Sequence, residues 1–293
     1  MTAQDYLLAT DSCCDLTRAI VDELSVEVLE FPFTLDGVQH YDDLGVSMPA
    51  QRFYESMRAG SAPTTAQVPM SSYLSTFSAA AESGRPLIFL SFSSALSGTY
   101  DTALLARQLV IDQFPAADIR VIDSRSASIN QGLLVLEAAR RRRDGTGFED
   151  LVEWIDGNVQ RVNGFFTIDT LEPLRRGGRV SDFAAMAGSV LDVKPLMRVS
   201  STGELVVDRP VRGRKKSLRA LVDAFERRAD DPLGDTVMIA HGDAPEDADT
   251  LERLLRERTG IGEVLRLEVG PVIGSHTGPG MLALVFWGTD RAS

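Results

Sequence analysis

The chain has little of several features that mark particular classes of protein. Its two cysteines, Cys13 and Cys14, are neighbours, and adjacent cysteines rarely form a disulfide because the bridge is strained. No apolar run approaches the roughly 20 residues that a membrane-spanning helix needs. No basic region precedes a hydrophobic stretch at the N-terminus. We therefore expect a cytoplasmic protein without a membrane segment.

Positive charge is also scarce. The 30 basic residues against 42 acidic ones give a net charge of -12, which repels nucleic acid and anionic membrane surfaces. The sequence contains no G-x-x-x-x-G-K-[ST] loop for a nucleotide and no G-x-S-x-G turn for a hydrolase serine. We expect no nucleic-acid partner, no metal and no cofactor.

Length and composition indicate two globular domains. At 293 residues the chain exceeds the size at which single cores stop growing, and its 44% hydrophobic and 25% charged residues are globular proportions. The predicted fold class is α/β, with an N-terminal domain at residues 1–160 and a C-terminal domain at residues 161–293 that meet at a cleft.

The first half alternates apolar runs with helical patterns, which is typical of a mainly parallel sheet with helices on both faces. Strands are predicted at residues 6–9, 26–35, 87–92 and 119–122. Helices are predicted at residues 16–24, 49–59, 71–83, 99–113 and 129–143.

The second half predicts a mixed-sheet α/β domain, because a Ser201-Thr202-Gly203 turn joins two short strands as a hairpin. Strands are predicted at residues 165–168, 195–199, 204–208, 236–240, 264–269 and 281–287. Helices are predicted at residues 148–162, 217–228 and 245–257.

Hydroxyl-rich loops follow several strands of the predicted parallel sheet. Asp11 and Ser12 follow the first strand, and Ser94 and Ser97 follow a later one. Because the carboxyl ends of parallel strands share one edge, these loops should converge on a ligand there. Ser97-Gly98-Thr99 begins a helix, where unpaired N–H groups suit an anion. The alternative is that Ser97 only caps the helix.

Two further segments are candidates for the same site. The loop PTTAQVP at residues 63–69 offers hydroxyl and amide groups, although it also suits a helix cap. The segment GPVIGSHTGPG at residues 270–280 predicts a glycine-rich loop that aims His276 into a cleft. His40 and His241 lack this framing, and we interpret them as structural or incidental.

Basic residues gather in two places. The segment LEPLRRGGRVS at residues 171–181 holds Arg179, and VRGRKK at residues 211–216 is the densest basic patch of an acidic chain. Charge runs are usually solvated surfaces. The alternative is that Arg212, Arg214, Lys215 and Lys216 dock an acidic partner or a phosphate.

The segments ATDSCCDL, PTTAQVP, SSALSGTY, LRRGGRVSD, VRGRKK and IGSHTGPG have the order and spacing of the DegV family, which the whole chain resembles. The resemblance implies a two-domain α/β fold that encloses one long-chain fatty acid between its domains, such as palmitate, stearate or oleate. It also implies a protein without catalytic activity, which presents this lipid to a dihydroxyacetone-kinase-like fatty acid kinase that forms acyl phosphate.

By position, the family's contacts to the fatty acid carboxylate fall on Thr65, Ser97, Gly98 and His276. Asp11, Ser12, Ser94, Thr277 and Arg179 are candidates for supporting roles. The family usually has Thr-Ser-Gln-Pro where this chain has Thr65-Ala66-Gln67-Val68, so one hydroxyl is missing. Two other functions stay open: a regulatory module that responds to lipid, and a serine hydrolase with Ser97, His276 and Asp11 as its triad.

Overall fold

The computed structural model describes residues 6–180, 193–230 and 236–292, so Ser181 and Asp182 of the arginine-rich motif lie outside the described residues. A four-stranded parallel sheet has the order β2-β1-β6-β7. Its strands are β1 Leu7–Asp11, β2 Glu27–Leu29, β6 Leu87–Ser91 and β7 Ile119–Asp123. The predicted parallel sheet of the first half is thus confirmed.

A six-stranded mixed sheet belongs to the second half, as predicted, and has the order β10-β9-β8-β13-β11-β12. All its described pairs are antiparallel except β11 with β12. The strands are β8 Val162–Thr167, β9 Val193–Val199, β10 Leu205–Arg212, β11 Val237–His241, β12 Val264–Glu268 and β13 Leu282–Trp287.

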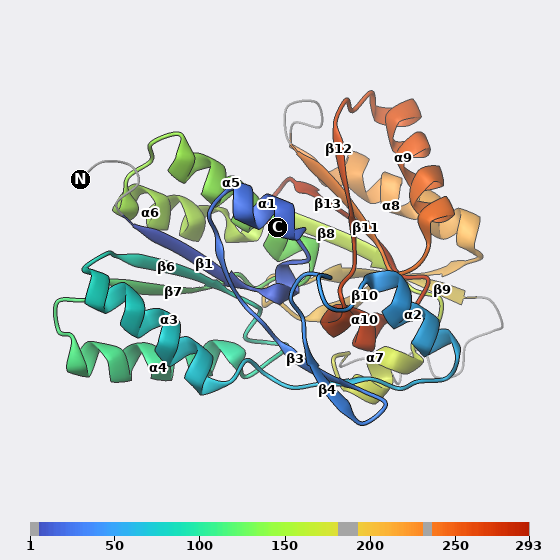
Figure 1. Ribbon diagram of the computed structural model, residues 1–293. Helices are drawn as coiled ribbons and strands as arrows, with labels where there is room; N and C mark the ends of the chain where they lie inside the picture. The colour runs from blue at the N-terminus through green and yellow to red at the C-terminus, as the bar shows by residue number, and fades with distance from the viewer. Residues whose placement is uncertain (1–5, 181–192, 231–235, 293) are drawn as a thin grey trace.

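Helices cover both sheets in layers (Figure 1). Helices α3 Met70–Ser83 and α4 Thr99–Gln113 lie together below the parallel sheet in this view, and α8 Arg214–Arg228 and α9 Pro245–Thr259 pack on the mixed sheet. The remaining helices of the first half are α1 Arg18–Glu23, α2 Ala50–Arg58, α5 Ile129–Arg143 and α6 Phe148–Asn158. No helix among the described residues is long and apolar enough to cross a bilayer.

Helix α5 joins the two halves. Its residues are buried almost throughout, although it ends in four arginines. Gln131 donates to Thr10 on β1, while other residues of the helix contact β8, β11 and β13 of the mixed sheet. One hydrophobic core therefore runs from Leu8 in the first half to Val285 in the second. The division of the chain at residue 160 stays a prediction.

A small third sheet was not predicted. It has the order β4-β3-β5, with β3 Pro32–Leu35, β4 Val38–Tyr41 and β5 Thr64–Thr65. The single strand predicted at residues 26–35 is wrong, because β2 ends at Leu29 and β3 starts a different sheet at Pro32. Proline has no N–H for a sheet ladder, and the N–H of Phe31 donates to the Ser12 hydroxyl instead.

Candidate functional site

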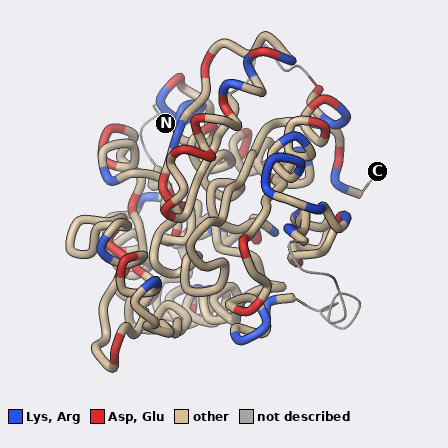
Figure 2. Tube along the Cα trace, turned by 90° about the vertical axis from the view of Figure 1, so that its right-hand side faces the viewer, with Lys and Arg blue, Asp and Glu red and all other residues tan. Residues whose placement is uncertain are grey.

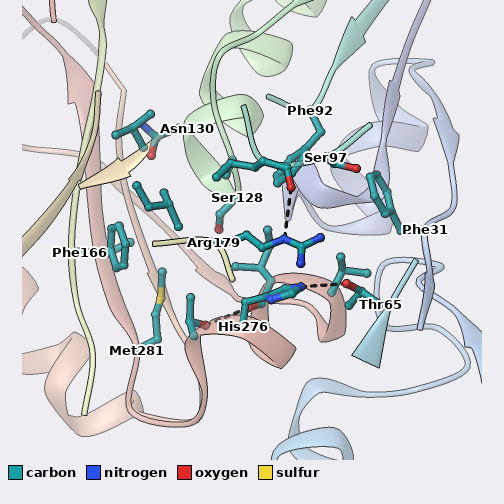
Figure 3. A pocket seen from close by; sticks show the side chains of 18 of the residues that line it. Phe31, Thr65, Phe92, Ser97, Ser128, Asn130, Phe166, Arg179, His276 and Met281 are labelled. Atoms are coloured by element: carbon teal, nitrogen blue, oxygen red, sulfur yellow. Dashed lines mark hydrogen bonds between the residues drawn. The ribbon is translucent and has the colours of Figure 1, made fainter. Parts of the chain in front are cut away.

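A cavity lies among residues of both halves of the chain (Figure 3). Most of its wall is apolar. The apolar lining consists of Phe31, Phe92, Leu96, Phe165, Phe166, Val199, Leu205, Val272, Ile273, Met281 and Ala283, with Ala66 and Ala127.

Polar groups gather at one end of this cavity. Thr65 Oγ1 lies 2.8 Å from Nε2 of His276, and the side chains of Ser97 and Arg179 line the same region (Figure 3). Strand β5 carries Thr65, which is held opposite Phe33 of β3. The structure therefore brings together three of the four predicted carboxylate contacts, Thr65, Ser97 and His276, in one lining.

The segment around His276 is a helix rather than the predicted loop. Helix α10 spans Pro271–Thr277, with proline at its first turn and Gly278 after its end. Proline fits the first turn because that position has no helical N–H partner. The glycines serve a different purpose: Gly278 and Gly280 have φ of 75° and 84°, a left-handed backbone that other residues rarely adopt. The histidine is consequently held on a helix rather than on a mobile loop.

The imidazole of His276 is packed tightly from the side opposite Thr65. It lies against Gly177, the last residue of α7 Glu172–Gly177, where a Cβ atom would stand 2.1 Å from Nδ1. Burial, followed by the charges of Arg179 and Arg176, lowers the pKa of His276 to about 4. The ring is therefore neutral at pH 7, and its Nδ1 has no hydrogen-bond partner among the described residues.

Ser97 serves the helix and the cavity at once. Its Oγ accepts from the Thr99 N–H at 3.2 Å and donates to Thr99 Oγ1 at 3.0 Å, which ties it to the first turn of α4. Gly98 is the N-cap residue of α4 and is approached closely by Gln67, since an added Cβ would meet Gln67 Oε1 at 2.8 Å. Both interpretations of Ser97 are compatible with this geometry.

Arg179 brings a positive charge to the polar end. Its Nε donates to the Leu96 carbonyl at 3.3 Å and its Nη1 to the Gly177 carbonyl. Figure 3 shows the guanidinium lying over His276 and directed toward the side of Thr65. Its Nε and Nη1 donate to carbonyl oxygens rather than to a carboxylate, and the guanidinium forms no ion pair with a described residue.

The other candidates lie elsewhere or have local partners. Asp11 accepts from the Phe92 N–H and from Gln131, and burial raises its pKa to about 7. Ser12 accepts from Phe31, and Ser94 donates to Asp123. These three residues are not part of the cavity lining, whereas Thr277 lines it but donates its hydroxyl to the Ile273 carbonyl.

The positions of Asp11 and Ser97 test the serine hydrolase triad of Ser97, His276 and Asp11. In Ser-His-Asp catalysis a carboxylate orients the histidine, but no described carboxylate is bonded to His276, and Asp11 is engaged by the core of the parallel sheet. The hydroxyl of Ser97 is likewise bonded to Thr99 rather than to His276. The geometry of the described residues therefore gives no support to a serine nucleophile here.

Sequence reasoning missed the apolar wall and several polar members of the lining. Gln67, Ser128 and Asn130 face the cavity together with the apolar side chains. Their positions depend on how distant strands pack, and no local pattern marks them. No group of three or more His, Cys, Asp or Glu able to hold a metal occurs in residues 6–180, 193–230 and 236–292.

The basic patch Arg212, Arg214, Lys215 and Lys216 lies at the start of α8 and just before it. Arg214 is largely covered and forms an ion pair with Asp247 at 2.8 Å. The other three residues are exposed and form no ion pair with a described residue. Figure 2 shows that charged residues elsewhere are also concentrated in the outer helices and loops, with acidic and basic ones intermingled.

Comparisons with known proteins agree with one another. Residues 7–288 match the family model described as an uncharacterised protein of the DegV family. A DegV domain-containing protein of Clostridium perfringens is 38% identical over 286 residues, which cover 98% of this chain and 98% of the relative.

Two solved structures have the same fold. A DegV family protein from Thermus thermophilus, described for its fatty acid binding, has a TM-score of 0.87 at 27% identity and covers 97% of this chain and 100% of its own. A stearic acid-binding protein from Eubacterium ventriosum has a TM-score of 0.85 at 26% identity, with 96% of this chain and 98% of its own covered.

Proposed function

The chain belongs to the DegV family, and from this premise we propose that it binds one long-chain fatty acid in the cavity between its two large sheets. The observation that carries the proposal is a long apolar wall ending at the Thr65–His276 pair, which matches the chemistry of a lipid with one polar end. Relatives of the same fold are described as binding fatty acids, one of them stearic acid.

The apolar wall provides most of the affinity. Burial of a chain of about 16 carbons at about 0.8 kcal/mol per methylene gives roughly 12 kcal/mol before the costs of association and ordering. A buried carboxyl group without hydrogen bonds would cost several kcal/mol of this. Thr65, Ser97 and His276, which line the polar end of the cavity, are the groups we assign to it, together with the backbone of Gly98 next to Ser97.

The polar end holds the carboxyl group without a carboxylate of the protein competing for it. His276 is neutral at pH 7, so the hydrogen bonds come from hydroxyl and imidazole groups. Arg179 adds a positive charge beside them. A carboxylate held in this way keeps lone pairs free for reaction with a phosphoryl donor.

We further propose that the protein presents this carboxyl group to a dihydroxyacetone-kinase-like fatty acid kinase and has no catalytic activity of its own. The partner would supply ATP, and the exposed cations Arg212, Lys215 and Lys216 would dock it. Cytoplasmic location, where such a kinase would meet its nucleotide, forms part of the proposal. Complex formation with the purified kinase and acyl phosphate production test it.

Mass spectrometry of lipid extracted from the purified protein tests the binding itself. We expect about one fatty acid per chain, released only on denaturation, because an apolar cavity is costly to leave wet. A protein with no extractable acyl chain, and no uptake when stearate is offered, would refute the proposal. Hydrolysis of an activated ester together with covalent labelling of Ser97 would establish a hydrolase instead.

A further inference from the structure

One polar side chain in the apolar part of the cavity has no assigned partner. Asn130 lies in the first turn of α5, is 5% exposed and lines the cavity. Its Nδ2 atom has no hydrogen-bond partner among the described residues. Buried amide groups are almost always bonded, so this carboxamide offers a donor to a polar group inside the cavity.

Strand β8 has a glycine at the point where this carboxamide packs against it. Gly164 of β8 lies against it, and a Cβ atom there would stand 2.0 Å from Oδ1 and 2.1 Å from Nδ2 of Asn130. Gly164 is buried within a strand and pairs with Val285 of β13. Glycine weakens a strand interior and often marks close approach by another group, and here that group is the amide of Asn130.

The carboxamide is distant from the groups assigned to the carboxyl end. Figure 3 shows Asn130 on the opposite side of the cavity from Thr65, on the same side as Phe166 and Met281. Ser128 lies between these two ends and also lines the cavity. Since its hydroxyl donates to Asp15, its oxygen keeps the capacity to accept a hydrogen bond.

We propose that the cavity is built for a fatty acid whose chain carries an oxygen substituent, a hydroxyl or oxo group, at the carbon that lies beside Asn130. This inference rests on the proposed function and specifies its substrate class. An N–H donor and a carbonyl acceptor on one amide satisfy either group. A plain methylene at the same place would leave the amide unpaired.

The test compares stearate with a series of monohydroxystearates whose hydroxyl stands at successive carbons. Delipidated wild-type protein and the Asn130→Leu variant are titrated with each, and the ratio of the dissociation constant of stearate to that of each hydroxystearate is measured. In the wild type we expect this ratio to peak at one region of the chain. In the variant the peak should fall by about tenfold, which is the size of one hydrogen bond to a buried group.

Two further variants serve as controls, one at the carboxyl end of the cavity and one beside the Asn130 amide. Ser97→Ala, at the carboxyl end, should weaken all ligands by one factor and leave the position of the peak unchanged. Gly164→Ala keeps the amide but displaces it, so it should flatten the peak as Asn130→Leu does; it also serves if the leucine variant does not fold.

The outcomes separate this inference from the proposed function. If no hydroxystearate is favoured over its isomers by the wild type, or if Asn130→Leu and Gly164→Ala retain the peak, the inference is wrong and a buried water is the partner of Asn130. If the wild type binds neither stearate nor any hydroxystearate, the proposed function itself fails.

Discussion

Replacement of Thr65 by valine removes the hydroxyl bonded to His276 and keeps the size and branching of the side chain. The hydrogen bond of 2.8 Å would be lost, and neither ring nitrogen would then have a partner among the described residues. Loss of one partner of a buried group costs about 1–3 kcal/mol. At about 2–4 °C per kcal/mol for chains of roughly this size, Tm of the delipidated protein should fall by several degrees.

Thermal denaturation of delipidated Thr65→Val and wild type, with and without stearate, measures this effect. Thr64→Val is a matched control, because Thr64 precedes Thr65 in β5, is exposed and undergoes the same chemical change. We expect Thr64→Val to match the wild type, and stearate to raise Tm of Thr65→Val less than that of the wild type. Equal Tm values and equal stearate responses for both variants would refute a role of this hydrogen bond in the site.

Three other predictions concern separate parts of the molecule. Ser97→Ala should retain extractable fatty acid but bind it roughly tenfold more weakly, as expected for one lost hydrogen bond, and acyl phosphate formation with the kinase should fall further. Native mass spectrometry measures the first loss and a kinase assay the second. A variant equal to wild type in both would show that Ser97 is not part of the site. Burial raises the pKa of Asp15 to about 7 in the folded protein, so folding favours the protonated acid. The contribution of this group to the free energy of unfolding is complete below about pH 4 and is lost as the pH rises through about 7. Urea denaturation between these pH values should therefore show a shallower decline for Asp15→Asn than for wild type, and parallel curves would contradict the assignment. Reversal of charge at Lys215 and Lys216 should slow association with the kinase and weaken its salt dependence, with Arg253→Glu on another helix as control; unchanged association rates would exclude the patch.

Local patterns predicted the elements whose ends are set by neighbouring residues. The helix predicted at residues 99–113 coincides with α4 Thr99–Gln113, because a buried strand, a hydroxyl-rich turn and Gly98 precede it. The same turn placed Ser97 correctly at the carboxyl edge of the parallel sheet. Local sequence also marked the loop that holds Thr65 and the segment that holds His276 as candidates, and the family resemblance assigned both residues to a carboxylate together with Ser97.

Features that depend on distant contacts could not be predicted. Glycine density around His276 indicated a loop, but residues 271–277 are helical, and Gly278 and Gly280 follow the helix where Pro173 and Asp169 lie close to them. Asp11 has the sequence context of a ligand-binding loop, yet it is engaged by Gln131 from a helix 120 residues away. The apolar wall is assembled from ordinary strand and helix residues, so no motif reveals it.

The polar end of the cavity is assembled from segments that are made at very different times. The bond between Thr65 and His276 joins residues 211 positions apart, and the bond from the Gly270 N–H to Asp15 spans 255 positions. At the usual 5–20 residues per second of synthesis, roughly 10–40 s separate the emergence of the first two partners. The Thr65–His276 pair therefore forms only after helix α10 has been made and has docked. On the proposed function, a fatty acid could stabilise the finished protein but could not serve as a template for the folding of the first half.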